Sequence, residues 1–151
     1  MSRPDAPDFS PVISPILVSA CLAGVACRYD GGASPHPEVL RLLAAGRVLP
    51  VCPEVLGGLP VPREPVELRQ GRAVGRSGLD VTEAFQAGAQ RALARAREHG
   101  CTSAILKARS PSCGPGQIYD GTFSRTLAPG DGVLAALLKQ SGFAVLSEEE
   151  L

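Results

Sequence analysis

Three of the five cysteines in this chain stand where an apolar run gives way to a turn rich in glycine and proline. Cys21 ends the run PILVSAC, Cys52 follows RVLPV, and Cys113 comes shortly after SAILKA. Ligands of open α/β sheets bind in the crevice outside the carboxyl ends of the strands, so we expect these three thiols to converge. Three thiolates around one centre leave a coordination position open, a pattern that favours chemistry over a purely structural metal site.

Each of these cysteines, taken singly, also fits a buried core thiol, because free cysteine is among the most buried residue types. Their shared position before sequences that turn the backbone favours convergence instead. None of the five cysteines is spaced as C-x-x-C, so the spacing does not indicate a closed mononuclear zinc site. Widely separated single cysteines suit a cluster that receives one thiolate from each loop.

Other polar residues fall in the same three loops. Glu54, two residues after Cys52, is a candidate general base, with capping of the next turn as its alternative role. Ser110 and Ser112 precede the third cysteine, where their hydroxyls could bond a cluster sulfur or a substrate oxygen, or only satisfy the turn. Three guanidinium groups are candidates for binding an anion or a planar polar ligand, or for bonding loop carbonyls: Arg28, Arg63 and Arg109.

The remaining cysteines and the histidines have weaker claims to chemistry. Cys27 lies six residues after Cys21 and fits a fourth ligand, a resolving thiol or a thiol buried beneath the site. Cys101 begins a predicted strand, which places it at the opposite end of the sheet, and we interpret it as structural. His36 precedes a predicted helix and His99 ends one, where a cation suits the helix dipole, so neither is a convincing base or metal ligand.

Composition narrows the function classes. The chain has 151 residues, 44% of them hydrophobic, and 15 basic residues balance 15 acidic ones. That size and composition predict one compact domain, and the balanced charge disfavours DNA or long RNA as a partner. The chain has no GxGxxG, no Walker loop and no GxSxG, which removes the common dinucleotide, nucleotide and serine-hydrolase interpretations.

The N-terminus carries no basic head followed by an apolar segment, and no apolar run reaches the roughly 18 residues that a membrane span requires. We therefore expect a cytoplasmic protein without a membrane partner. In a reducing cytosol the five cysteines are not expected to form a disulfide framework.

Short apolar runs alternate with helical patterns, which predicts an α/β fold with a small, mostly parallel sheet flanked by helices in a Rossmann-like three-layer arrangement. A flexible arm over residues 1–14 is expected to precede this domain, which covers residues 15–151. Strands are predicted at 16–20, 48–51, 103–106 and 144–146, with a strand or hairpin arm at 72–74.

Helices are predicted at 37–45, 81–99 and 132–140. The second begins with Asp80 as N-cap and Glu83 in a capping box, and its small buried face is expected to let it lie close to the sheet. The segment CPEVLGGLPVPREPVEL is predicted to be irregular, and IYDGTF to form a hairpin tip.

The strings VSACLAGVACRYDGG, CPEVLGGLPVPREPVE and ARSPSCGPGQIYDG resemble the signatures of the thiouracil desulfidase family, and the resemblance runs from Ile16 to the last predicted strand. It implies a small α/β domain with a 4Fe-4S cluster held by Cys21, Cys52 and Cys113, one iron being free of any protein ligand. It also implies Glu54 as the acid/base group and Ser110 as the assisting hydroxyl. The acidic tail at 148–150 falls outside the recognised strings.

The expected function is therefore that of an iron–sulfur-dependent, non-redox desulfurase, a hydrolase- or lyase-like enzyme. It would replace the sulfur of a thiolated pyrimidine such as 2-thiouracil by oxygen and release sulfide. A free base, a nucleoside and a tRNA nucleotide all fit, although the balanced charge argues mildly against tRNA. Three residues are expected to contact the substrate: Arg28, Arg63 and Ser112. The sequence does not indicate an oligomeric state.

Two other interpretations remain open at this point. A metal-binding protein could sense redox state or pass on sulfur without turnover, with Cys27 as the partner of a reversible disulfide. A metal-free thiol enzyme could use Cys21 or Cys113 as its nucleophile, but neither histidine stands where a base is needed.

Overall fold

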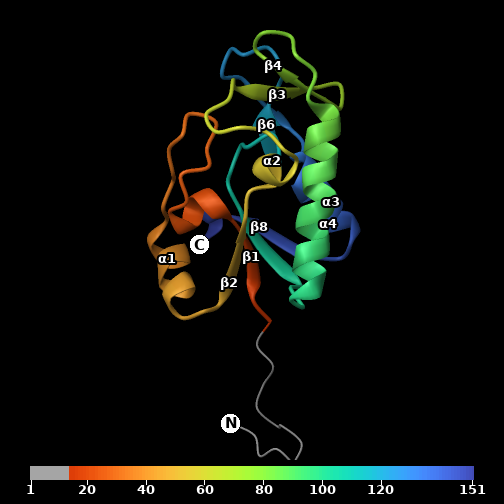
Figure 1. Ribbon diagram of the computed structural model, residues 1–151. Coiled ribbons are helices and arrows are strands. Elements are labelled where there is room, and N and C mark those ends of the chain that lie inside the picture. The colour runs from red at the N-terminus through yellow and green to blue at the C-terminus, as the bar shows by residue number, and fades with distance from the viewer. Residues whose placement is uncertain (1–13) are drawn as a thin grey trace, which may run out of the picture.

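The computed structural model describes residues 14–151, and its centre is a four-stranded sheet in which every pairing is parallel. The strand order is β2-β1-β5-β8 (Figure 1). Each strand is four residues long, built from an apolar run: β1 (Ile16–Ser19), β2 (Val48–Val51), β5 (Ser103–Leu106) and β8 (Ala144–Ser147). The predicted α/β fold with a mostly parallel sheet is confirmed.

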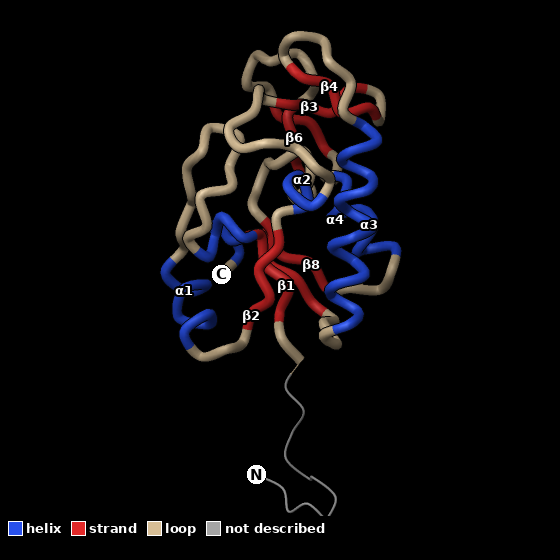
Figure 2. Tube along the Cα trace, viewed as in Figure 1, coloured by secondary structure: helices blue, strands red, loops and turns tan. Residues whose placement is uncertain are grey.

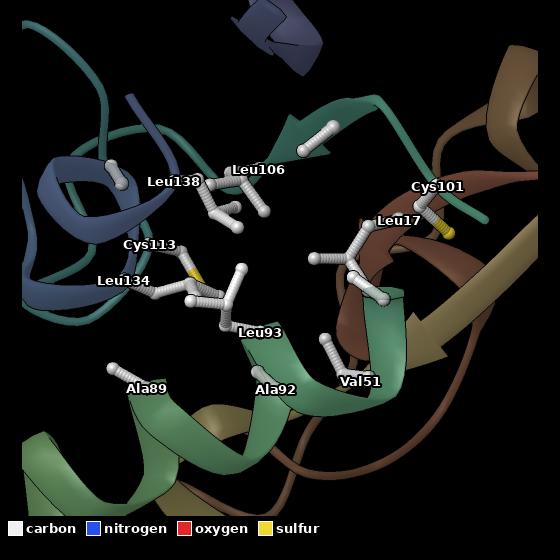
Figure 3. Close-up of a cluster of buried hydrophobic side chains, with 13 residues drawn as sticks. Leu17, Val51, Ala89, Ala92, Leu93, Cys101, Leu106, Cys113, Leu134 and Leu138 are labelled. Carbon is white, nitrogen blue, oxygen red and sulfur yellow. The ribbon is translucent and has the colours of Figure 1, made fainter. Parts of the chain in front are cut away.

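Helices cover both faces of this sheet (Figure 2). Side chains alternate across each strand, so Val18 and Ile105 face α1 (Pro37–Ala44), whereas Leu17 and Leu106 face α3 (Thr82–Glu98) and α4 (Val133–Gln140). Figure 3 shows the second of these two cores, where Leu93 of α3 and Leu134 and Leu138 of α4 meet the strands. The three-layer arrangement follows from this alternation.

The small buried face predicted for the long helix is present on α3, where it packs on the sheet and also lies close to another helix. A Cβ on Gly88 would lie 1.8 Å from the carbonyl oxygen of Pro53, in the short helix α2 (Pro53–Leu56). A Cβ on Gly57 would lie 2.0 Å from the carbonyl oxygen of Ala84. These two glycines let α2, which carries the second site loop, lie directly against α3.

The predicted N-cap of α3 is wrong by one residue. Val81 occupies the cap position, and no side chain caps the helix from there. Asp80 accepts the Thr82 N–H with one carboxylate oxygen, at 2.9 Å, and binds Arg72 Nε with the other, at 2.7 Å. Because both oxygens are taken one position before the cap, the predicted capping box with Glu83 does not form.

The segment after Cys52, predicted to be irregular, contains α2 and a strand. That strand, β3 (Val66–Arg69), forms an antiparallel hairpin with β4 (Arg72–Gly75), which covers the predicted arm at 72–74. The connecting residues Gln70 and Gly71 both have positive φ, 51° and 78°, as a two-residue hairpin turn requires. Strand β3 was not predicted because Gln-Gly is a weak turn signal and the prolines before the strand are typical of irregular backbone.

A second hairpin joins β6 (Gln117–Tyr119) to β7 (Leu127–Pro129). The predicted IYDGTF tip begins within β6, and its residues 120–123 lie in the connection. Two short 3-10 turns, η1 (Ala20–Ala23) and η2 (Glu148–Glu150), follow β1 and β8 directly. The arm expected over residues 1–14 lies, apart from Ser14, outside the described residues. Among the described residues, no helix has both the length and the apolar character needed to cross a membrane.

Candidate functional site

A cavity of about 730 Å³ opens at the carboxyl ends of β1, β2 and β5. The connection from β1 runs to β2 on one side of the sheet, whereas β5 continues to β8 on the other. The boundary between β1 and β5 is thus the topological switch point, where open α/β sheets bind ligands. Four of the five cysteines line this cavity: Cys21, Cys27, Cys52 and Cys113.

Each of the three predicted thiols reaches the cavity from a different loop. Cys21 lies in η1, directly after β1, and is buried, with 8% of its surface exposed. Cys52 directly precedes α2, and Pro53 supplies the first helical residue, where a missing N–H costs nothing. Cys113 is 4% exposed and belongs to a turn held by Ser110, whose Oγ accepts the Cys113 N–H at 3.0 Å.

Burial controls the charge of two of these thiols. It raises the pKa of Cys113 to about 12, an effect opposed by the neighbouring hydroxyls of Ser19 and Ser112. It raises the pKa of Cys21 to about 11, an effect opposed by the ammonium group of Lys107. Without a bound cation, both thiols are protonated at neutral pH.

Cys52 differs from the other two. Its interaction with the Cys27 thiol, together with the N–H of Val55, holds the pKa of Cys52 below its usual range. Negative charge on Cys52 in turn raises the pKa of both Cys21 and Cys113, so the three sulfurs are close enough to influence one another's ionisation.

The donor set fits a multinuclear group better than a single ion. Within residues 14–151, no set of three or more His, Cys, Asp and Glu side chains is close enough to hold one metal ion. Three soft thiol donors instead surround a cavity of about 730 Å³. A cluster of several irons and sulfides spaces its thiolates more widely than one ion does, so this arrangement suits an iron–sulfur cluster.

A buried carboxylate faces the thiols. Glu54, in α2, is 9% exposed and accepts a hydrogen bond on each of its oxygens. Arg63 Nε donates to Oε1 at 2.9 Å, and Ser112 Oγ donates to Oε2 at 2.7 Å. A hydroxyl has one proton to donate, and Ser112 donates its proton to Glu54. Ser110 is therefore the donor in the 3.1 Å contact between the two serine hydroxyls. The result is a chain of two hydroxyls that ends on the carboxylate.

Arg63 is a link between loops. Besides Glu54, its guanidinium donates to the carbonyl of Cys27 at 2.8 Å and to that of Pro60 at 3.0 Å. Its backbone N–H donates to the carbonyl of Tyr29 at 2.8 Å. All three guanidinium nitrogens therefore have acceptors within the protein, and the side chain is 7% exposed.

The other two predicted arginines are also bound by nearby groups. Arg28 lines the cavity and donates to Ser34 Oγ at 2.6 Å and to Asp30 Oδ2 at 3.3 Å. Arg109 lines the cavity with a left-handed backbone, φ 65°, and pairs with Glu149 at 2.7 Å.

The residues with weaker claims lie as the sequence predicts. Cys101 is buried in the core between the sheet and α3, and Figure 3 shows it apart from Cys113. His36 is the N-cap of α1, where its Nδ1 accepts the Glu38 N–H at 3.2 Å, and His99 is the C-cap of α3. Cys27 faces the cavity beside Cys52, whose Sγ lies 3.8 Å from the Cys27 carbonyl oxygen.

Sequence reasoning missed three residues at this site. Ser19 ends β1, and its Oγ accepts the Lys107 N–H at 2.8 Å. Lys107 follows β5 and pairs with Glu148, which follows β8, at 3.1 Å. All three stand at carboxyl ends of strands, so the argument that selected the cysteines could have found them.

Aromatic and cationic side chains form the outer wall of the cavity. The hairpin regions contribute Tyr119, Phe123, Arg76 and Arg125, and the loop after η1 contributes Tyr29. The Arg76 guanidinium lies 5.4 Å from the centroid of the Phe123 ring. A planar, polarisable ligand can stack on such a wall.

The fold and the site define an α/β protein with a thiol-lined cavity at the switch point of a parallel sheet. The chain belongs to the 2-thiouracil desulfurase family, whose family model matches residues 16–150. This confirms the resemblance seen in the three sequence strings. The match extends through the acidic tail at 148–150.

Two similar proteins support the family assignment. The uncharacterized protein YbbK of Bacillus subtilis (strain 168) is 46% identical over 146 residues, which cover 90% of this chain and 97% of YbbK. A solved structure of the 4Fe-4S-dependent thiouracil desulfidase TudS matches with a TM-score of 0.87 and 46% identity. That match covers 91% of this chain and 93% of TudS.

Proposed function

We propose that this protein is an iron–sulfur-dependent desulfurase that replaces the sulfur of a thiolated pyrimidine by oxygen without net redox change. One observation carries the proposal: three thiols from three loops share a cavity with a buried carboxylate and a hydroxyl chain. Membership in the 2-thiouracil desulfurase family and the similarity to TudS support it.

Cys21, Cys52 and Cys113 would hold a 4Fe-4S cluster and leave one iron without a protein ligand. When bound, such a cluster supplies a soft Lewis acid suited to a thiocarbonyl sulfur. Support comes from the placement of the three thiols and from the cofactor of TudS, a 4Fe-4S-dependent enzyme. Cys27 then remains a neighbour of the site.

The protein's own groups would manage the protons of the reaction. Glu54 takes a proton at Oε2 from a water molecule in the cavity as the water oxygen attacks the carbon that carries the sulfur. Ser112 contacts this same oxygen and Ser110 contacts Ser112, so the hydroxyl chain steadies the carboxylate. Breaking the C–S bond returns this proton to the leaving sulfur, and the proton of the newly added hydroxyl passes to Glu54 and on to solvent. The products are an oxo base and hydrosulfide.

The walls of the cavity support a planar base as the substrate. Tyr29, Tyr119 and Phe123 offer planar surfaces for a pyrimidine ring, and Arg28 stands in the lining beside the thiols. A volume of about 730 Å³ admits a base with a sugar attached, so free base, nucleoside and tRNA nucleotide all remain candidates. The five free cysteines suit the reducing cytoplasm, where we propose that the enzyme works.

The test is to quantify iron and acid-labile sulfide after anaerobic reconstitution, in wild type and in Cys21→Ser, Cys52→Ser and Cys113→Ser. Wild type should hold about four of each per chain, and the three variants should lose them. Cys101→Ser is the matched control, a buried cysteine outside the cavity, and should retain the iron. Sulfide release from 2-thiouracil is then measured on the loaded protein. Absence of iron, or iron unaffected by the three substitutions, contradicts the proposal.

A redox-sensing or sulfur-transfer protein is the alternative, and the contact between Cys27 and Cys52 favours it. Cys27→Ser separates the two functions. A sensor that forms a Cys27–Cys52 disulfide with peroxide loses its response in this variant, whereas a desulfurase keeps its turnover.

A further inference from the structure

Lys107 occupies a fixed place in the cavity wall. It directly follows β5, and its backbone N–H is tied to Ser19 Oγ at the end of β1, at 2.8 Å. Its Nζ donates to the carbonyl of Ala108 at 3.2 Å and lies 3.1 Å from Glu148 Oε2. An ammonium group has three hydrogens, so one remains after these two contacts among the described residues.

Glu148, which follows β8, holds the Lys107 ammonium group in place. Its second oxygen accepts the Ala108 N–H at 2.7 Å, and its side chain is 12% exposed. The turn that carries it is closed by a capping box between Ser147 and Glu150. Glu148, outside the strings that carried the family resemblance, thus holds two residues of the cavity wall, Lys107 and Ala108.

Lys107 combines a remaining N–H with partial burial: its side chain is 23% exposed, against 36% for Arg28 and 34% for Arg109. Arg63 has an acceptor for each guanidinium nitrogen, Arg28 is bound by Ser34 and Asp30, and Arg109 pairs with Glu149. Lys107 lines the cavity together with the thiols. Its backbone N–H binds Ser19, two residues before Cys21, and its positive charge opposes the rise in the pKa of Cys21.

We propose that Lys107, positioned by Glu148, binds negative charge at the Cys21 side of the cavity, both on the thiolate-held cluster and on the hydrosulfide that leaves. This inference rests on the proposed function and assigns it a further binding residue. Glu148 is the positioning residue, and it acts through Lys107. A charge-assisted hydrogen bond to a partly buried anion is strong enough to affect both the potential of the cluster and the affinity for hydrosulfide.

The first test is the midpoint potential of the reconstituted cluster, measured by anaerobic redox titration followed by absorption. Loss of a nearby cation disfavours the reduced, more negative cluster, so Lys107→Met should lower the potential. Glu148→Gln removes an anion, keeps an oxygen for the Ala108 N–H, and should raise it. Glu98→Gln is the control, since Glu98 is exposed at the end of α3 and does not line the cavity, and it should leave the potential almost unchanged.

Opposite shifts in the two variants support the inference, because general loosening of the site would move both in one direction. Shifts of the same sign, or none, overturn it. If Lys107→Met does not fold, the sign of the shift in Glu148→Gln decides alone.

The second test is the affinity of the reconstituted protein for sodium sulfide, followed by absorption. Lys107→Met should weaken binding about ten-fold or more, and Lys107→Arg should weaken it less because the charge remains. Equal affinities in wild type and Lys107→Met overturn the inference. If wild type assembles the cluster and releases sulfide from 2-thiouracil, such a failure concerns Lys107 alone. If wild type assembles no cluster, the proposed function fails, and this inference with it.

Discussion

Arg63→Met should destabilise the protein far more than the loss of a surface ion pair would. The side chains of Arg63 and Glu54 are 7% and 12% exposed, and their contact is 2.9 Å long. Removing the arginine leaves a buried carboxylate without its cation, which costs about 3–5 kcal/mol. The carbonyls of Cys27 and Pro60 lose a donor at the same time.

The measurement is urea unfolding of the cluster-free protein under reducing, anaerobic conditions, supported by thermal unfolding. At about 2–4 °C per kcal/mol for a chain of this size, the expected drop in Tm is about 6–20 °C. Arg72→Met is the matched control. Arg72 also binds its carboxylate through Nε, at 2.7 Å to Asp80, but these side chains are 60% and 42% exposed. An exposed pair contributes about 1 kcal/mol or less.

A loss in Arg63→Met no larger than that in Arg72→Met would refute the reasoning, since burial would then not set the cost. The double variant Arg63→Met/Glu54→Gln adds a second check. It removes both charges, so it should be more stable than the two single losses together predict, by about 0.5–3 kcal/mol. Strict additivity would mean that the two groups do not interact.

Two further predictions concern the hydroxyl chain and the helix contact. Ser112→Ala should keep its iron but lower kcat about 10²-fold, because it removes the hydrogen-bond donor to the proposed base, Glu54. Ser110→Ala should lose iron, because the backbone N–H groups of Ser112 and Cys113 both lose their acceptor. Equal iron and equal kcat in the two variants would contradict this. Gly88→Ala should cost about 3 kcal/mol or more in urea unfolding, because its Cβ would lie 1.8 Å from the Pro53 oxygen, while Gln90→Ala on the exposed face of α3 should cost nothing measurable. A stable Gly88→Ala protein would show that the two helices separate easily.

Patterns within short stretches of sequence predicted the strands and helices, because the type of each element depends mainly on neighbouring residues. Apolar runs of four residues gave the strands of the main sheet, and the 3.6-residue period gave α3 with its buried face. The rule that ligands gather at the carboxyl ends of strands selected Cys21, Cys52 and Cys113, which line one cavity. These predictions needed only the type of each element and the turn that follows it.

Contacts between distant segments escaped prediction because no local signal encodes them. Asp80 is a residue type that often caps helices, yet its carboxylate is bound by Arg72 and the Thr82 N–H, and the helix has its N-cap one residue later, at Val81. Arg63 has the chemistry of a substrate-binding group, but its nitrogens find acceptors in loops that only folding brings near. Glu148 lies 41 residues from Lys107 along the chain, and the pairing of β5 with β8 brings them together.

The same long-range contacts explain how three short loops can hold their cysteines in fixed positions around one cavity. Each cysteine loop is tied by a side chain to another loop: Ser112 to Glu54, Arg63 to the Cys27 carbonyl, and Ser19 to the Lys107 amide. These contacts and the two apolar cores on the faces of the sheet are made by protein groups alone. A domain with two apolar cores of its own has a source of folding free energy besides a metal, unlike small metal domains in which metal binding supplies that free energy. If Cys21 and Cys113 hold the proposed cluster, their buried thiols must lose their protons as it binds, against the rise in pKa that burial causes.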